Sequence, residues 1–544
     1  MGGPLAASPA GFPPLVRLLT GAVLAAAIAA QWSPAFATYD SDLWTYVLIV
    51  ERVADGQDVL GQEPFRLEPP ASPHVTVIWL GLGYLRRWSG LPSLDLVRAF
   101  ALASIALLCA GAWVLAGRLF GRGWLRGVAL LLFWFAMPET WSAVALGRYL
   151  SLAWVALAAA AALAIDEHPR ATALTAAFVA LGFYTHLFGG VLAAAAVLIV
   201  AVARGRGGEA PRPRALVSAL VGGAVLAAPC LGYALATAGL SRTSAHTWRP
   251  EQVEALGFRL MSPGQLLELF PASVLGLALV GLVVPPRPER RRARAIAGVG
   301  TLLCALVLLT PLYHWAVEWF GGWMVGRVAA LAFPWVSAAL ALEWMLGDGR
   351  AWARRAAVAA LLAVVAAQGF GRAASDWRDR AYAFTAAARG EALALRETLR
   401  GHTYLAPSLI GYGVAAPTLG RPLAVPPGHA SPFGDFRRQE RRVHRALAAN
   451  TEECWAALLG LYPDVAFLLT PAAGATVERR IWQERLPETS PEAVRERLRA
   501  LGALEPVHEG PTFVLDALRP APFLAGRSPR RGGMGSGRSC REEP

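Results

Sequence analysis

The chain has 544 residues, of which 55% are hydrophobic and 16% are charged, and its mean hydropathy is +0.42. Soluble domains carry about 25% charged residues, so this composition excludes an ordinary soluble protein and indicates a polytopic membrane protein. The formal net charge of +13 would favour a nucleic-acid partner in a soluble chain. Much of the excess here lies in short loops between apolar runs, where it reports topology, and we expect no nucleic-acid partner.

The first long apolar run, 15–37, is followed by two carboxylates, Asp40 and Asp42. They lie where hydrocarbon gives way to water, because a charge a few residues deeper would cost roughly 2.5–3.5 kcal/mol. A short amphipathic helix ending at Gly56 is predicted next, and a Pro-rich segment precedes the second apolar stretch, 75–85. The first run also fits a cleavable signal peptide, although it is longer than usual, and cleavage would leave the remaining topology unchanged.

Apolar runs recur along the chain, and we count about eleven that are long enough, at roughly 17–25 residues, to span a bilayer. The predicted spans are 15–37, 92–117, 125–141, 149–165, 171–185, 187–203, 215–236, 265–284, 295–313, 324–345 and 354–371. Alternate loops between them are rich in arginine, for example 204–214 and 287–294, and the positive-inside rule places these loops in the cytoplasm. The first loop, 38–91, and the chain after Arg372 are then both external.

The character of the chain changes near residue 373, where strand and helix patterns begin to alternate. Short strands are predicted at 403–406, 422–425, 465–469 and 512–515. Strands that alternate with helices favour a small α/β domain, and the Gly, Ser, Arg and Pro of the last residues are typical of disorder. We therefore expect a membrane domain, 1–372, with the external loop 38–91, an external α/β domain, 373–520, and a disordered tail, 521–544.

Ionisable side chains are rare within the predicted spans and gather at their outer ends. These residues are Asp95, Arg98, Glu139, Arg148, Glu268 and Arg327, and the external loops add histidines such as His74 and His186. Secondary transporters place their sites near the bilayer midplane, so this pattern indicates a site at the outer membrane–water boundary instead. No spacing typical of a metal site, such as C-x-x-C or H-E-x-x-H, occurs.

The order of these features resembles the C-type (GT-C) polytopic glycosyltransferases, the superfamily of the protein O-mannosyltransferases and the bacterial aminoarabinose transferases. The resemblance rests on the acidic pair after the first span, the Pro-rich entry to a second short helix at 73–88, the turn Tyr184-Thr185-His186 within 182–189, and the many spans ending in an external domain. It implies an α-helical polytopic membrane protein of GT-C-like fold with a small external α/β C-terminal domain.

The resemblance also implies an activity. The expected protein is a glycosyltransferase, taken to be inverting, in the bacterial cytoplasmic (inner) membrane. It would move a sugar from a polyprenyl-phosphate donor to a lipid, glycan or protein acceptor at the outer face. Asp40 and Asp42 are then the catalytic candidates, and Asp40 is the expected base. The substrate-binding candidates are His74, Arg148, Tyr184, His186 and Arg327.

Arginine suits the donor because it matches a phosphate bidentately and stays charged. No cofactor follows with certainty from the sequence. Some relatives use a divalent cation, and Asp40 and Asp42 would be its ligands here.

Each candidate also has a structural explanation. Asp42 begins a helix, where capping alone would account for it, and His186 could cap the helix before it. Arg148 and Arg327 could be interfacial residues whose charged heads reach the water. The alternative function is that of a non-enzymatic membrane scaffold, or of a lipid-linked sugar exporter with an external interaction domain.

Overall fold

The computed structural model describes most of the chain, and every structural statement below concerns the described residues. These are 18–22, 25–26, 28–29, 37–39, 42–68, 75–121, 123–136, 147–206, 213–241, 270–313, 326–347, 352–378, 382–426 and 436–519. The chain divides by its contacts into two compact units. The first unit comprises 1–33, 98–236 and 246–378, and the second comprises 34–97, 237–245 and 379–544.

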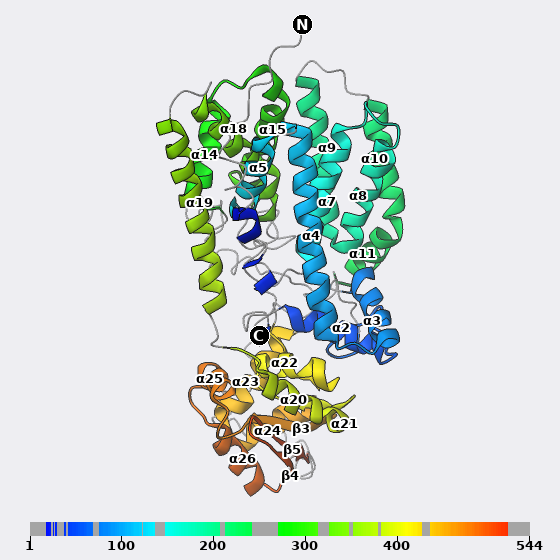
Figure 1. The fold of residues 1–544 in the computed structure, drawn as a ribbon. Coiled ribbons are helices and arrows are strands. Elements are labelled where there is room, and N and C mark those ends of the chain that lie inside the picture. Colours follow the sequence, from blue (N-terminus) through cyan, green and yellow to red (C-terminus); the bar gives the residue numbers. More distant parts are fainter. Residues whose placement is uncertain are drawn as a thin grey trace. The chain divides into compact units, whose positions relative to one another are not determined.

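The first unit is a helical assembly (Figure 1). Its helices are α4 (Ser93–Phe120, with its first residues in the second unit), α5 (Trp124–Ala136), α7 (Gly147–Leu163), α8 (Ala171–Thr185), α9 (Leu187–Arg206), α10 (Pro213–Leu226), α11 (Ala228–Ser241, with its last residues in the second unit), α14 (Ala272–Val283), α15 (Arg291–Leu308), α18 (Pro334–Leu346) and α19 (Trp352–Arg378), with the short 3-10 helices η2 (Pro288–Arg290) and η3 (Gly326–Ala332).

Small residues let the helices of the first unit approach closely. Helices α7, α8 and α9 pack on one another, α10 packs on α8, and α14 packs on α18. A Cβ added to Gly281 on α14 would collide with the backbone carbonyl of Ser337 on α18. A Cβ at Gly300 would likewise collide with the carbonyl of Leu331. Close packing of this kind is typical of helix pairs in membranes, where glycine allows the backbones to touch.

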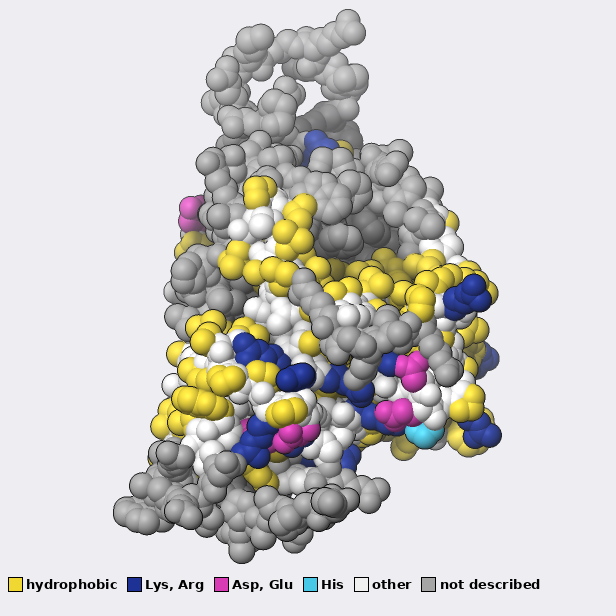
Figure 2. Space-filling view, turned by 90° about the horizontal axis from the view of Figure 1, so that it is seen from above, with side chains coloured by type: hydrophobic (Ala, Val, Ile, Leu, Met, Phe, Trp, Pro, Cys, Tyr) yellow, Lys and Arg dark blue, Asp and Glu magenta, His cyan; other side chains and the backbone are white. Residues whose placement is uncertain are grey.

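Several described helices have the length and the surface of membrane spans. The segments Ser93–Phe120, Leu187–Gly205 and Val328–Leu346 are long and apolar enough to cross a membrane, and six further apolar helices are shorter. On α9, the side chains of Leu187, Val191, Leu198 and Val202 are 43–52% exposed and recur on one helix face. Hydrophobic side chains also cover much of the described surface in Figure 2. The expected count of about eleven spans stays a prediction.

The second unit combines helices with one mixed sheet. Its helices are α2 (Leu43–Ala54), α3 (Val77–Ser89), α20 (Ala386–Ala394), α21 (Arg396–Leu399), α22 (Ser408–Thr418), α23 (Phe436–Ala449), α24 (Glu452–Leu461), α25 (Thr476–Arg485) and α26 (Pro491–Ala500). Its strands are β1 (Thr403–Leu405), β2 (Arg421–Pro422), β3 (Val465–Pro471), β4 (Leu504–Glu509) and β5 (Phe513–Leu518).

The strands of this sheet follow the order β2-β1-β3-β5-β4. Strand β1 runs parallel to β2 and β3, whereas β5 is antiparallel to both β3 and β4. Leu468 of β3 belongs to one buried hydrophobic cluster with Trp455 of α24 and Trp482 of α25. A C-terminal sheet flanked by helices is therefore present, as the alternating strand and helix patterns led us to expect. Its mixed strand order and strand β4 were not predicted from the sequence.

Helix α2 differs from its prediction. We expected an amphipathic helix with one wet face, but every residue of α2 except Tyr46 and Ala54 is buried. Helix α3 packs on one side of α2 and α22 on another. The segment after the first apolar run is thus a core helix of the unit that contains the C-terminal sheet. The domain boundaries expected from the sequence stay a prediction.

Candidate functional site

The residues just before Asp40 are fixed by the C-terminal part of the chain. Thr38 forms an antiparallel bridge with Ala383. The amide of Tyr39 donates to the carbonyl of Tyr382 at 2.8 Å, and the amide of Phe384 donates to the carbonyl of Ala37 at 2.9 Å. Asp40 itself lies outside the described residues, so its place in the structure stays a prediction.

Tyr39 is anchored by its side chain as well. It is fully buried, and its ring stacks on that of Phe384 with 4.4 Å between the centroids. The hydroxyl donates to Oε1 of Glu478 at 2.9 Å. Burial, and then the adjacent Glu478 carboxylate, raise the pKa of Tyr39 well above its ordinary value, so this hydroxyl is a stable donor.

Asp42 stands at the N-cap position of α2 and makes no side-chain capping bond. The capping explanation for this residue is therefore wrong. A tyrosine takes the role instead, because the Thr45 amide donates to Oη of Tyr412 at 3.1 Å and the Thr45 hydroxyl lies 3.0 Å from the same oxygen. Burial, and then the charge of Asp42, raise the pKa of Tyr412 well above its ordinary value. The carboxylate of Asp42 is partly exposed.

A buried arginine on α2, which the sequence analysis did not single out, joins three segments of the second unit. Arg52 is fully buried. Its Nε donates to the carbonyl of Pro64 at 2.6 Å, Nη1 donates to Gln57 Oε1 at 2.7 Å and to the carbonyl of Leu419 at 3.1 Å, and Nη2 donates to the carbonyl of Gly420 at 3.0 Å. Burial lowers the pKa of Arg52 to about 10, so it stays charged at neutral pH.

Glu51 on α2 and Asp55 at the C-cap of this helix are four positions apart, and they face two arginines that are also four positions apart. Arg396 Nη1 donates to Glu51 at 3.1 Å, and Arg400 Nη2 donates to Asp55 at 2.8 Å. Glu51 also accepts from the Ser93 hydroxyl at 2.6 Å. These pairs join residues 345 positions apart in sequence, so periodicity along the chain could not reveal them. The only local signal was the matched spacing of acids and bases.

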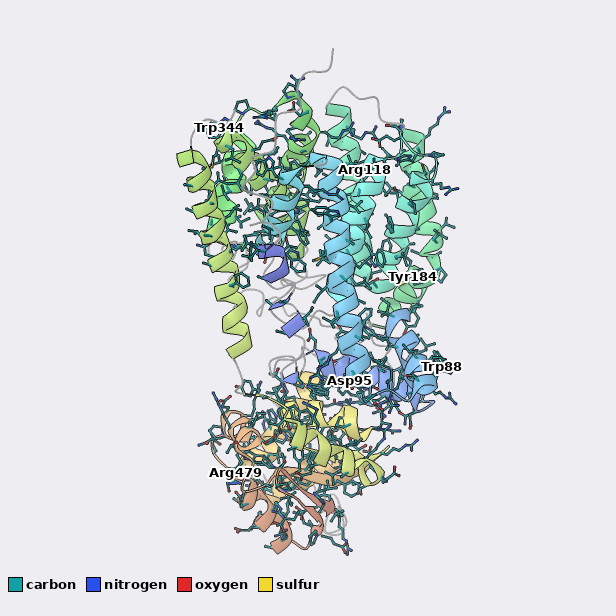
Figure 3. The ribbon with its side chains drawn as sticks, in the orientation of Figure 1. Trp88, Asp95, Arg118, Tyr184, Trp344 and Arg479 are labelled. Carbon is teal, nitrogen blue, oxygen red and sulfur yellow. The ribbon has the colours of Figure 1, made fainter. Side chains whose placement is uncertain are left out.

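The Tyr184-Thr185-His186 turn lies in the first unit, between α8 and α9. Tyr184 (Figure 3) donates its hydroxyl to the carbonyl of Leu226 at 2.9 Å. Thr185 accepts a bond from Trp154 Nε1 at 2.8 Å. His186 occupies the C-cap of α8 through its backbone amide, which donates to Gly182 at 2.9 Å. The turn is therefore well ordered, while a substrate-binding role for Tyr184 and His186 stays a prediction.

The other candidates are described only in part. His74 lies outside the described residues. Arg148 falls in the first turn of α7 and Arg327 in η3, but neither side chain is described. That these residues and Asp40 belong to one substrate site therefore stays a prediction. Within the described part of the chain, no group of three or more His, Cys, Asp or Glu side chains could hold a metal ion. A cation at Asp40 and Asp42 also remains a prediction.

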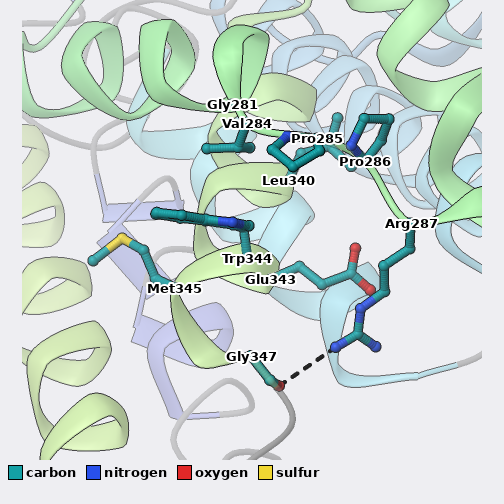
Figure 4. A pocket seen from close by; sticks show the side chains of 10 residues that line it. All are labelled: Gly281, Val284, Pro285, Pro286, Arg287, Leu340, Glu343, Trp344, Met345 and Gly347. Atoms are coloured by element: carbon teal, nitrogen blue, oxygen red, sulfur yellow. Dashed lines mark hydrogen bonds between the residues drawn. The ribbon is translucent and has the colours of Figure 1, made fainter.

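One cavity of about 580 Å³ opens between the ends of α14 and α18 (Figure 4). It is lined by residues that include Arg287, Glu343 and Trp344. Glu343 is paired with Arg290 at 3.1 Å, and Arg287 donates to the carbonyl of Gly347 at 3.4 Å. The cavity adjoins the arginine-rich loop that the sequence places in the cytoplasm, and none of the candidate residues whose side chains the structure describes lines it.

Comparison with known proteins bears on the fold. No family model matches the chain, and no curated protein matches it in sequence. Two structures of a variant of the arabinofuranosyltransferase AftD from Mycobacteria match it with 17% sequence identity and TM-scores of 0.51 and 0.54. The matches cover 92% and 93% of this chain but 41% of that protein, so the chain spans well under half the length of AftD.

ArnT from Cupriavidus metallidurans, in a crystal structure with bound undecaprenyl phosphate, also matches. The identity is 12%, and the match covers 93% of this chain and 98% of that one. Its TM-score of 0.49 is too low to establish a shared fold. The apolar helices and the AftD match make this chain a multi-pass membrane protein. The resemblance expected from the sequence is confirmed at the level of structure, since the chain is similar in fold to the GT-C membrane glycosyltransferases.

Proposed function

We propose that this chain is a membrane glycosyltransferase. It moves a sugar from a polyprenyl-phosphate donor to a lipid, glycan or protein acceptor at the outer face of a bacterial cytoplasmic membrane. The observation that carries the proposal is the similarity to AftD, a sugar transferase by name, over 93% of this chain. A shared fold alone does not transmit an activity, so the proposal also rests on the acidic pair and on the way its neighbours are held.

The grouping of the chain supports an external site. Residues 34–97 and 379–544 belong to one compact unit, and a compact unit of this kind lies on one side of a membrane. The arginine-rich loops place both segments outside by the positive-inside rule. Asp40 therefore belongs to the outer boundary, where the phosphate of a lipid-linked donor also lies.

The chemistry that we propose is a single displacement. Asp40 takes the proton of the acceptor hydroxyl, and the oxygen attacks the anomeric carbon. The bond from that carbon to the phosphate oxygen breaks, so the sugar inverts and the polyprenyl phosphate leaves with the electron pair. Arg148 and Arg327 are the proposed cations for the phosphate, because a guanidinium stays charged and binds two phosphate oxygens at once. If a divalent cation takes part, Asp40 and Asp42 are its proposed ligands.

The decisive experiment uses the full-length protein in liposomes with polyprenyl-phosphate sugars. The measured product is free polyprenyl phosphate, which transfer releases whatever the acceptor is. Asp40→Asn should lose at least about 10²–10⁴-fold in rate, the range typical of a general base, while insertion and yield stay unchanged. Asp42→Asn should lose less.

A matched control is Asp58→Asn, which changes an exposed carboxylate of the same loop. Its oxygen accepts from the amide of Leu60 at 2.8 Å, a bond that asparagine also makes, so full activity is expected. Transport of the donor across the bilayer with no release of polyprenyl phosphate would instead identify an exporter. Release by Asp40→Asn at the wild-type rate would remove the assignment of the base.

A further inference from the structure

We propose that Glu478 is a positioning residue for Asp40, acting through the hydroxyl of Tyr39. The inference rests on the proposed function, because it assumes that Asp40 is the base. Glu478 lies on α25, and 439 positions separate it from Tyr39 in sequence. It is not proposed to touch the substrate. Its role is to fix the residue that directly precedes the base.

The side chain of Tyr39 is held on three sides. Its ring stacks on Phe384, and the same phenylalanine ring meets the ring of Trp44 edge-on at 5.1 Å. On α22, a Cβ at Gly413 would collide with the Tyr39 ring, so glycine at this position makes room for it. The bond from Tyr39 Oη to Glu478 then sets the rotation of the ring and its depth in the unit.

Packing alone does not explain why Tyr39 and Glu478 form a polar pair. Glu478 is only 3% exposed, and a buried carboxylate is costly unless its hydrogen bonds are made. A phenylalanine facing an apolar side chain would fill the same space without that cost. The neighbouring carboxylate Glu391 is already satisfied, because it accepts from the amides of Thr512 and Phe513 at 2.9 Å each. Tyr39 therefore has one dedicated acceptor.

The chain between the fixed points is short. Tyr39 is anchored as described, and Asp42 begins α2, so only two residues connect them. Consecutive Cα atoms are about 3.8 Å apart, so a shift of Tyr39 acts on a residue that is one peptide unit away. Because a misplacement of about 1 Å can cost about 10²-fold in rate, the position of Tyr39 should matter to catalysis by Asp40.

Three single variants and one double variant test the inference in full-length protein in liposomes. Tyr39→Phe keeps the ring and removes the donor, whereas Glu478→Leu removes the acceptor. Glu478→Gln keeps an acceptor oxygen and should rescue the function. We expect Tyr39→Phe and Glu478→Leu each to lower kcat about 10- to 100-fold with KM unchanged. The double variant, Tyr39→Phe with Glu478→Leu, should have a kcat no lower than that of either single variant, because each substitution removes the same interaction.

A matched control is Tyr382→Phe. The Tyr382 hydroxyl also donates to a glutamate of α25, Glu484. The substitution removes only this hydroxyl and leaves the backbone carbonyl that accepts from Tyr39, so kcat should stay at the wild-type value. A loss of folded protein without a change in kcat would make the Tyr39–Glu478 pair structural and overturn the inference. An equal loss in Glu478→Gln and Glu478→Leu would also overturn it.

Asp40→Asn is measured alongside, so that the two proposals fail in different ways. If Asp40→Asn is inactive and Tyr39→Phe keeps the wild-type kcat, only the positioning role is refuted. If Asp40→Asn transfers sugar at the wild-type rate, the base is wrong and the positioning role falls with it.

Discussion

The two units of this protein are each stabilised internally, and the contacts that stand out in one differ in kind from those in the other. In the first, glycines let helices meet backbone to backbone, as at Gly281 and Gly300. In the second, buried polar side chains form hydrogen bonds between segments that are distant in sequence, as Arg52 does. In lipid there is no hydrophobic driving force for the association of helices, so close van der Waals packing must stabilise it. A water-exposed unit can exclude water around a few charged groups, each of which must then be fully bonded.

If buried polar side chains stabilise the second unit, replacing Arg52 should cause the largest loss in its free energy of unfolding. Arg52→Met fills a similar volume but leaves the carbonyls of Pro64 and Gly420 without their Arg52 donor, while the carbonyl of Leu419 keeps only the amide of Gly401, at 3.2 Å. An unsatisfied buried group costs about 1–3 kcal/mol, so a total loss of roughly 3 kcal/mol or more is expected. Limited proteolysis in rising urea would measure it.

The control for Arg52 is Arg480→Met on α25. Arg480 pairs with Glu484 at 2.9 Å and is 57% exposed, and such a pair contributes about 0.3–0.5 kcal/mol. Equal losses in the two variants would show that burial of the cation is not what matters.

A second test uses the pH dependence of stability that a buried histidine of the same unit should produce. Nε2 of His444 accepts from the amide of Ser408 at the start of α22, at 3.2 Å. Burial, and then the charge of Arg485, lower the pKa of His444 to about 4. The folded state thus favours the neutral ring. The contribution of neutral His444 to stability is complete above the pKa of about 6.5 that histidine has in the unfolded chain. This contribution is lost as the pH falls through about 4.

The expected loss is on the order of 3 kcal/mol over that window, at about 1.4 kcal/mol for each pKa unit. His444→Gln keeps an acceptor that does not titrate. The wild type should therefore lose more stability than the variant between pH 7 and pH 4, as followed by thermal unfolding. Parallel pH profiles for the two proteins would contradict the assignment.

The smallest expected loss of stability is in the first unit, and it tests whether close contacts at glycines stabilise the packing of its helices. Gly281→Ala places a methyl group against the carbonyl of Ser337, and overpacking of this kind costs about 1–3 kcal/mol. Gly276→Ala on the same helix meets nothing within 4 Å and should be neutral or slightly stabilising. Thermal stability of the detergent-solubilised protein would separate the two variants, and equal midpoints would refute the close contact.

The membrane class could be predicted from the sequence, because apolar runs are local patterns. The GT-C-like fold was expected only from the resemblance of several motifs and their order to that superfamily. Strands β1, β3 and β5 could also be predicted from local patterns, because their apolar residues form short runs. Strand β4, Leu504–Glu509, could not be predicted in this way, since it is an edge strand rich in polar residues. The amphipathic appearance of α2 was misleading for a similar reason, because partners elsewhere in the chain cover its polar face.

For the candidate site, the sequence by itself singled out Asp40 and Asp42, because two carboxylates after an apolar run are visible locally. Only the tertiary structure decided what holds their neighbours. Asp42 does not cap α2, since Tyr412 does, and Tyr39 is fixed by Glu478. Tyr412 lies 367 positions along the chain from Thr45, whose amide it accepts from, and Glu478 lies 439 positions from Tyr39. Contacts at such separations depend on how the whole second unit folds, and no periodicity within a short segment carries that information.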